Sequence, residues 1–167
     1  TTHCEISGVT DYKHPNDEAC LQSIRNIVDK MGARPTAGFS RVAAVAPKES
    51  WDTLPEVFPF DRAKPYDMGE ILKRLCDNSE WEEYKALYGK TILCAYARID
   101  GWAVGIVANQ RKMVKSKKGE MQMGGVIYSD SADKAARFIM NCNQKRIPLL
   151  FIQDVSGFMV GSRSEHG

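Results

Sequence analysis

The stretch that decides the fold is TILCAYARIDGWAVGIVANQ, residues 91–110. It contains two runs rich in apolar residues, 91–99 and 102–108, with Asp100 and Gly101 between them. An Asp-Gly pair between two such runs is a strong signal for a two-residue β-hairpin. The stretch therefore predicts two antiparallel strands joined by a tight turn.

Helical patterns flank this hairpin. Before it, Asp67 can cap a helix, and Glu70 stands three residues later as in a capping box. Residues 80–87 indicate a second, shorter helix. After the hairpin, Asp130 or Ser131 begins a long helix. The residues expected on the buried side of that helix are Ala132, Ala135, Ala136, Ile139 and Met140.

Two further segments complete the pattern. Residues 109–125 are polar and basic, and they predict a loop or a long hairpin. Residues 149–153 predict a buried strand that starts after Pro148. Strands that alternate with helices favour an α/β domain, and the hairpin means that its sheet is not purely parallel.

The N-terminal part has a different organisation. Asn16 or Asp17 can cap a helix with an apolar face that continues to residue 31. The 35–65 segment contains five prolines and no periodicity, which is typical of a connector. We therefore predict three parts, residues 1–34, 35–65 and 66–167.

The composition excludes several function classes. The 167 residues include 23 basic and 21 acidic ones, and the net charge of +2 gives no general attraction to nucleic acid. No apolar stretch approaches the roughly 20 residues that a membrane span needs. The five cysteines and three histidines are scattered, so they predict reduced thiols and no metal site.

The segment FIQDVSGFMVG, residues 151–161, is the main candidate site. Gly157 and Gly161 follow a buried strand, where glycine lets the backbone stay bare and lets another molecule approach. If a helix begins near residues 159–162, amide groups of the turn point outwards and can hold an anion or a developing oxyanion. The alternative is an ordinary turn between a strand and a loop. The chain contains no GxGxxG, GxxxxGKS or GxSxG motif.

Three segments resemble a known family. Residues 66–110 and 131–167 are similar to the start and the continuation of the C-terminal half of biotin-dependent carboxyltransferase subunits, and residues 3–32 are similar to the end of the N-terminal half. The motif ARIDGWAVGIVAN and the turn GFMVG carry the resemblance. GFMVG is most similar to the branch of the methylcrotonyl-CoA carboxylase β-subunit.

The resemblance implies an α/β fold of the crotonase-like (ClpP/crotonase) carboxyltransferase type. It implies an incomplete fold that spans the junction of two domains and forms the middle of a longer subunit. Residues 1–34 would end the N-terminal crotonase-like domain, residues 35–65 would be the connector, and residues 66–167 would begin the C-terminal domain.

The resemblance also implies the chemistry. The family moves a carboxyl group between carboxybiotin and an acyl-CoA thioester, and backbone N–H groups stabilise the charged oxygens. By this analogy the backbone amides of Gly157, Phe158 and Met159 are catalytic on the biotin side. Ser156, Val160 and Gly161 would contact the substrate. The other donors and most of the coenzyme A site would lie outside this chain, so the fragment alone would be inactive.

The resemblance leaves alternatives open. An extension, residues 110–128, is longer than in the carboxylase branch and has Gly-Gly before a Tyr, as in the α-subunit of glutaconyl-CoA decarboxylase, which transfers carboxyl from acyl-CoA to biotin. Its basic part is residues 111–118. Its cations could attract a coenzyme A phosphate or an acidic partner, or could form a solvated loop. A third possibility is a non-catalytic crotonase-like module for acyl-CoA binding or assembly.

The resemblance further implies partners and a location. The expected partners are a biotin carboxyl carrier domain, a biotin carboxylase subunit and further copies of the subunit. The expected location is the cytoplasm, or the mitochondrial matrix in a eukaryote.

Overall fold

The computed structural model describes residues 11–31, 40–61, 63–116 and 119–165. The chain divides into two compact units, Thr1–Ala37 and Gly38–Gly167. The predicted boundary at residues 34–35 lies outside the described residues. In the first unit, α2 (Asp17–Met31) forms where expected, and Asn16 Oδ1 accepts a hydrogen bond from the Ala19 N–H at 2.9 Å.

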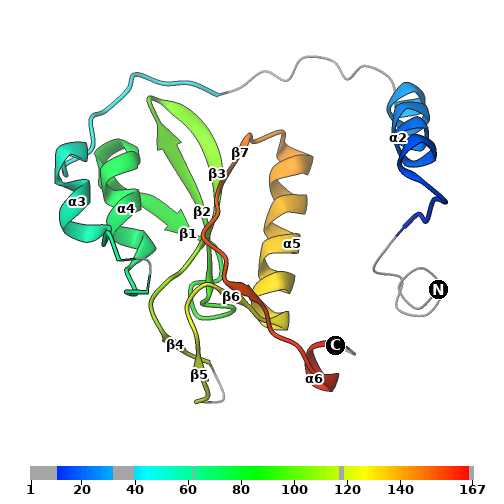
Figure 1. The fold of residues 1–167 in the computed structure, drawn as a ribbon. Helices are drawn as coiled ribbons and strands as arrows, with labels where there is room; N and C mark the ends of the chain where they lie inside the picture. The colour runs from blue at the N-terminus through cyan, green and yellow to red at the C-terminus, as the bar shows by residue number, and fades with distance from the viewer. Residues whose placement is uncertain (1–10, 32–39, 62, 117–118, 166–167) are drawn as a thin grey trace. The chain divides into compact units, whose positions relative to one another are not determined.

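The centre of the second unit is a four-stranded sheet in the order β1-β2-β3-β7 (Figure 1). Its strands are β1 (Trp81–Glu83), β2 (Ile92–Ile99), β3 (Trp102–Asn109) and β7 (Leu149–Ile152). The β1–β2 and β2–β3 pairs are antiparallel, whereas β3 and β7 are parallel. This mixed sheet confirms the predicted hairpin. Asp100 and Gly101 both have positive φ, 50° and 78°, as a tight hairpin turn requires.

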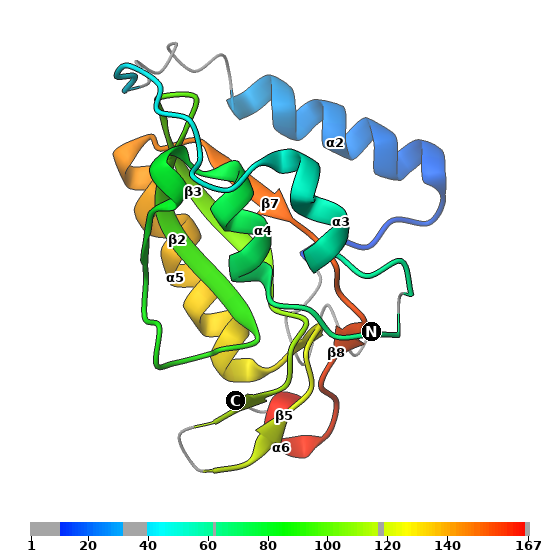
Figure 2. The ribbon, with the colours of Figure 1, turned by 90° about the vertical axis from the view of Figure 1, so that its left-hand side faces the viewer.

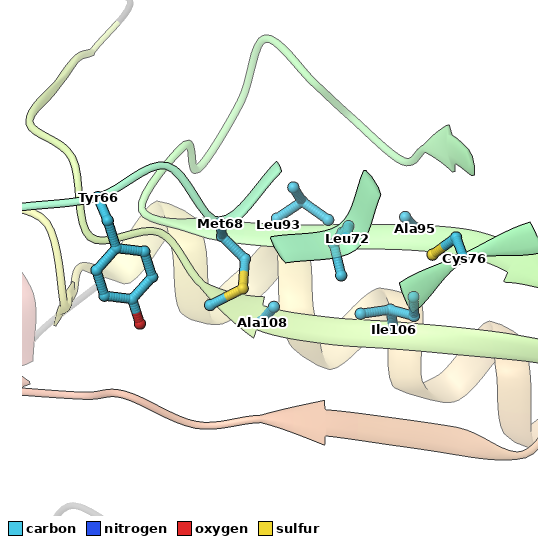
Figure 3. Packing of buried hydrophobic residues seen from close by; sticks show 8 residues of the cluster. All are labelled: Tyr66, Met68, Leu72, Cys76, Leu93, Ala95, Ile106 and Ala108. Carbon is cyan, nitrogen blue, oxygen red and sulfur yellow. The ribbon is translucent and has the colours of Figure 1, made fainter. Parts of the chain in front are cut away.

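Helices cover both faces of the sheet (Figure 2). On one face α4 (Met68–Leu75) packs against alternate residues of β2 and β3, and these buried side chains meet in one cluster (Figure 3). On the other face α5 (Ser129–Lys145) contributes Phe138 and Cys142 to a second cluster. The alternation along β2 and β3 therefore places their apolar residues in two separate cores, as expected for a sheet buried on both sides.

The buried face of α5 differs from the prediction. Its buried residues are Ser131, Lys134, Phe138 and Cys142, whereas Ala132, Ala136 and Met140 are exposed. Lys134 is fully buried, and its Nζ lies 3.4 Å from Glu83 Oε1. Ala135 and Ile139 are partly buried against the second cluster, as predicted. The rest of the predicted face was wrong because a pattern of apolar residues cannot anticipate a buried lysine that is paired with a carboxylate.

The predicted helix at residues 80–87 is also wrong. Residues 81–83 form β1 and pair with β2, with Trp81 opposite Ala97. Lys85 then adopts a positive φ of 50°, which stops regular structure. Pairing with a neighbouring strand has overridden the local helical preference.

Short elements complete this unit. The connector contains η1 (Trp51–Thr53) and α3 (Leu54–Val57), and η2 (Asp77–Ser79) follows α4. The predicted long hairpin is confirmed, because β4 (Val114–Lys115) and β5 (Met121–Gln122) pair antiparallel. The chain then forms β6 (Val126–Ile127), and after β7 it forms β8 (Gly157–Phe158) and α6 (Ser162–Glu165).

Candidate functional site

The turn predicted as the site is held along one edge by β6. β6 and β8 pair in parallel, with Val126 opposite Gly157 and Ile127 opposite Phe158. The Met159 N–H donates to the Ile127 carbonyl at 2.8 Å. The expectation that this amide is available to a ligand is therefore wrong, because the ladder already uses it.

The Phe158 amide has a different direction. Donors alternate between the two edges of a regular strand, so the bond from the Met159 N–H to β6 predicts that the Phe158 N–H lies on the opposite edge. The Phe158 side chain is 71% exposed, and apart from the two chain neighbours no described residue has a heavy atom within 4 Å of the position that a Cβ on Gly157 would take. The backbone here is as bare as the sequence predicted.

The other predicted residues lie around this turn. The Ser156 N–H donates to the Gly125 carbonyl at 2.7 Å, so the pairing with the β6 side begins at Ser156. Val160 is 76% exposed. Gly161 precedes α6, and its carbonyl accepts from the Ser164 N–H at 2.8 Å. The turn thus brings Ser156 and Phe158 together, whereas Val160 and Gly161 lie beyond the ladder.

A cavity of about 740 Å³ lies beside the start of the turn. Apolar side chains of the connector, of α4 and of β7 form most of its wall, and a group of polar residues closes one side. Gly157 and Phe158 are not part of the wall, so the cavity reaches the turn at Ser156. The lining residues are Leu54, Pro55, Phe58, Pro59, Phe60, Asp61, Lys64, Tyr66, Ile71, Arg111, Ile152, Gln153, Asp154 and Ser156.

The polar side of the cavity centres on Asp154. The Tyr66 hydroxyl donates to Asp154 Oδ2 at 2.7 Å, and Arg111 Nε lies 3.3 Å from the same oxygen. The Asp154 N–H donates to Asn109 Oδ1 at 3.0 Å, which fixes the backbone as well. Burial, together with the hydrogen bond to Asp154, raises the pKa of Tyr66 well above its usual value. Tyr66 therefore remains a donor at any physiological pH.

Sequence reasoning missed this group. The arginine of the hairpin, Arg98, donates through Nη1 to the Gly101 carbonyl at 2.8 Å. Arg111 was expected in a basic, solvated extension, yet its side chain is only 15% exposed. The one usable signal was that Asp154 follows the predicted strand directly before the candidate turn. That strand, β7, is not buried as predicted, because Phe151 is exposed and its other residues are only half-buried.

The remaining basic residues of the extension have separate places. Lys112 Nζ lies 2.5 Å from Asp67 Oδ2, and Lys115 belongs to β4. Lys117 and Lys118 lie outside the described residues. Over the ranges that the structure describes, no three His, Cys, Asp or Glu residues gather as a metal site would require, and no helix is long and apolar enough to cross a membrane.

Comparison with known proteins identifies the family. The model of the carboxyl transferase domain matches residues 1–167. The chain belongs to this family. It is 42% identical over 165 residues to the biotin-dependent 3-methylcrotonyl-coenzyme A carboxylase beta1 subunit of Mycobacterium tuberculosis, covering 99% of this chain and 28% of that subunit.

Two other relatives extend the comparison. The chain is 31% identical to the methylmalonyl-CoA decarboxylase subunit alpha of Propionigenium modestum, covering 99% of this chain and 31% of that one. A transcarboxylase 12S crystal structure, with methylmalonyl-coenzyme A and methylmalonic acid bound, superposes with a TM-score of 0.65 at 30% identity. The match covers 99% of this chain and 31% of that chain. The expected carboxyltransferase fold of the crotonase-like type is confirmed. This carboxyl transferase segment spans about three tenths of the length of these relatives.

Proposed function

We propose that this chain is the part of a biotin-dependent acyl-CoA carboxyltransferase that supplies a backbone donor on the biotin side. The family match over the whole chain carries the proposal. The identity of 42% with a methylcrotonyl-CoA carboxylase subunit favours the carboxylase branch. The relation to a decarboxylase α-subunit, at 31% identity, makes transfer from acyl-CoA to biotin the second candidate.

The turn fits a biotin head group in two respects. When bound, biotin supplies the ureido nitrogen that carries the carboxyl group and the ureido oxygen on which negative charge develops. We infer from the Met159–Ile127 bond that the Phe158 N–H points away from β6, where it can donate to such an oxygen. The space around Gly157 is open, so a flat ring can approach the backbone.

This chemistry needs no side chain that changes its protonation state. A fixed backbone dipole stabilises charge as it develops, and it costs no reorganisation during the reaction. Met159 is excluded as a second donor because its N–H is bonded to Ile127. We therefore assign the biotin-side role of this segment to Phe158, with Gly157 providing access and Ser156, Val160 and Gly161 next to the bound group.

The complete active site includes elements beyond this chain. We propose that a biotin carboxyl carrier domain and a biotin carboxylase subunit are its partners, that the acyl-CoA site lies largely on other segments, and that the subunit forms homo-oligomers. We also propose a cytoplasmic location, or the mitochondrial matrix in a eukaryote. The 167 residues alone are expected to transfer no carboxyl group.

The test uses a full-length carboxyltransferase polypeptide that contains this segment. Branched, short-chain and unsaturated acyl-CoAs and their carboxylated forms are incubated with free biotin, and biotin-dependent carboxyl transfer is measured. Phe158→Pro removes the backbone N–H and should lower kcat by ~10²–10³. Phe158→Ala keeps the N–H and should retain most of the activity.

The outcomes separate the candidate functions. Transfer that favours one branched or unsaturated acyl-CoA identifies a carboxylase, whereas a preference for a carboxylated short-chain thioester favours the decarboxylase direction. Acyl-CoA binding without any transfer would indicate the non-catalytic module and refute the proposal. Equal activity of Phe158→Pro and Phe158→Ala would remove Phe158 from the catalytic role.

A further inference from the structure

We propose that Arg111 is a positioning residue that holds the 156–159 turn in place and thereby sets the direction of the Phe158 amide. Its effect on catalysis rests on the proposed function, whereas its effect on the turn does not. It acts through Asp154 and Ser156, the two polar residues at the start of the turn.

The Arg111 guanidinium spans these two residues. Its Nη1 donates to Ser156 Oγ at 2.5 Å, and its Nε lies 3.3 Å from Asp154 Oδ2. An arginine fork can contact two groups in fixed geometry, which a lysine ammonium cannot do to the same degree. The guanidinium therefore ties both residues at the start of the turn to the end of β3.

The anchor itself is rigid. The Arg111 N–H donates to Oε1 of Gln110 at 2.9 Å, and the Gln110 N–H donates to the Thr91 carbonyl at 2.9 Å. The Gln110 side chain also binds the first turn of α4, because its Oε1 accepts from the Met68 N–H at 3.1 Å. Arg111 thus starts from backbone that is fixed to both the sheet and α4.

Two glycines lie close to Arg111, Gly125 against its side chain and Gly124 against its backbone. A Cβ on Gly125 would overlap Arg111 Nη1 and lie 2.9 Å from Ser156 Oγ, and Gly125 has a φ of 77°. A Cβ on Gly124 would overlap the Arg111 carbonyl. Gly125 also bonds the Gln110 carbonyl through its N–H and the Ser156 N–H through its carbonyl, at 2.8 and 2.7 Å. Gly125 therefore joins the end of β3 to the start of the turn through its backbone, and its missing side chain leaves room for the Arg111 guanidinium.

These contacts explain how the Phe158 amide keeps its direction. β8 has only two residues, and a ladder this short gives little stability by itself. Pairing at Ser156 and Met159 fixes its two ends, and the Arg111–Ser156 bond secures the first of them. Without Arg111 the turn should open more often, and the Phe158 N–H should lose its fixed direction.

The test measures hydrogen exchange and kinetics in a full-length polypeptide that contains this segment. In Arg111→Ala, amide exchange in peptides that cover residues 155–160 should become roughly tenfold faster or more, while exchange in the β2–β3 hairpin should not change. Ser156→Ala removes only the hydroxyl contact and should show the same effect more weakly. Arg111→Lys, which keeps the charge but not the fork, should fall between wild type and Arg111→Ala. Arg137→Ala, which breaks an exposed ion pair with Asp133, is the matched control and should change none of these values.

The kinetic readout distinguishes positioning from general damage. Arg111→Ala should lower kcat of biotin-dependent transfer by ~10- to 100-fold and leave KM for acyl-CoA within about twofold, because a misdirected donor affects the reacting centre. The double variant Arg111→Ala/Ser156→Ala should be no slower than Arg111→Ala, since both changes remove the same bond.

Each outcome gives a decision. Unchanged exchange at residues 155–160 in Arg111→Ala overturns the positioning role, as does a rise in KM for acyl-CoA at constant kcat. If Arg111→Ala does not fold, the same exchange measurement on Ser156→Ala decides. Faster exchange in a polypeptide whose wild type transfers no carboxyl group would uphold the positioning role and refute the proposed function.

Discussion

Asp67→Ala is expected to loosen the first turn of α4 and its connection to the end of β3. Asp67 Oδ1 accepts from the Gly69 N–H at 3.0 Å and from Gln110 Nε2 at 2.8 Å, and Oδ2 pairs with Lys112. The carboxylate is thus the N-cap of α4 and the acceptor for a buried amide. Burial alone would raise the pKa of Asp67, but the hydrogen bonds from Lys112 and Gln110 hold it below its usual value.

The magnitude follows from the three contacts. Loss of an N-cap costs about 1 kcal/mol. Loss of the acceptor leaves the amide of Gln110, a residue only 5% exposed, without this bond and costs about 1–2 kcal/mol. The half-exposed pair with Lys112 contributes at most about 0.5 kcal/mol. The total of about 2–3.5 kcal/mol corresponds to roughly 30- to 300-fold faster exchange of the α4 amides, at a factor of ten per 1.4 kcal/mol.

Hydrogen exchange of a peptide covering residues 68–75 in the intact protein measures this effect. Asp67→Asn is the informative companion, because asparagine is a good N-cap and keeps an oxygen for Gly69. Its exchange should accelerate less than about tenfold, since it loses mainly the ionic part of the contact. Asp133→Ala, which breaks an exposed pair away from any cap, should leave α4 unchanged. If exchange of the α4 amides accelerates equally in Asp67→Ala and Asp67→Asn, the N-cap argument is refuted, and the stabilising effect of Asp67 comes from its charge.

Three further predictions concern the same molecule. Because the pKa of Asp67 is lowered in the folded protein, its carboxylate contributes fully to stability above the unfolded pKa of about 3.9, and this contribution is lost as pH falls through the folded value. The exchange rate of the α4 amides should therefore rise with acid in the wild type, and this rise should be absent in Asp67→Asn. Burial raises the pKa of Cys76 to about 11 and that of Cys94 to about 12, so iodoacetamide should label the exposed Cys20 and spare these two until the protein unfolds, as mass spectrometry can check. The isolated 167-residue chain exposes many large apolar side chains, including Phe151 at 57%, and should self-associate; a monomer by light scattering would contradict this.

The parts of the fold that sequence predicted well are those with local causes. The β2–β3 hairpin formed as expected because the Asp100-Gly101 pair specifies its turn within a few residues. The β1 strand was missed because it exists only through pairing with β2. The face of α5 was misplaced because Lys134 is buried beside Glu83, and these residues come from distant parts of the chain. Non-local pairing decided each error.

In the candidate site, too, local features were predicted from the sequence and features that depend on distant segments were not. The bare backbone at Gly157 was evident from the sequence, and the structure agrees. The state of the Met159 amide depends on β6, and the role of Arg111 depends on its contacts with Asp154 and Ser156. Neither relation has a signature in residues 151–161. A family resemblance places the turn, but only the hydrogen-bond pattern selects which amide can act.

Strand geometry limits how many donors this turn can offer to one oxygen. Along an extended strand, amides on the same edge are two residues apart, or about 6.6 Å. An oxygen within hydrogen-bond reach of both would need them no more than about 6 Å apart, because each N–H···O contact is about 2.9–3.0 Å. As long as the chain stays extended, the strand edge that faces away from β6 can therefore give one oxygen a single donor, for which we propose the Phe158 N–H. The Met159 N–H does not add a second donor, because it is bonded to the Ile127 carbonyl. A second donor to the same oxygen has to come from another segment, which is why the loss of one N–H in Phe158→Pro should remove the whole contribution of this turn.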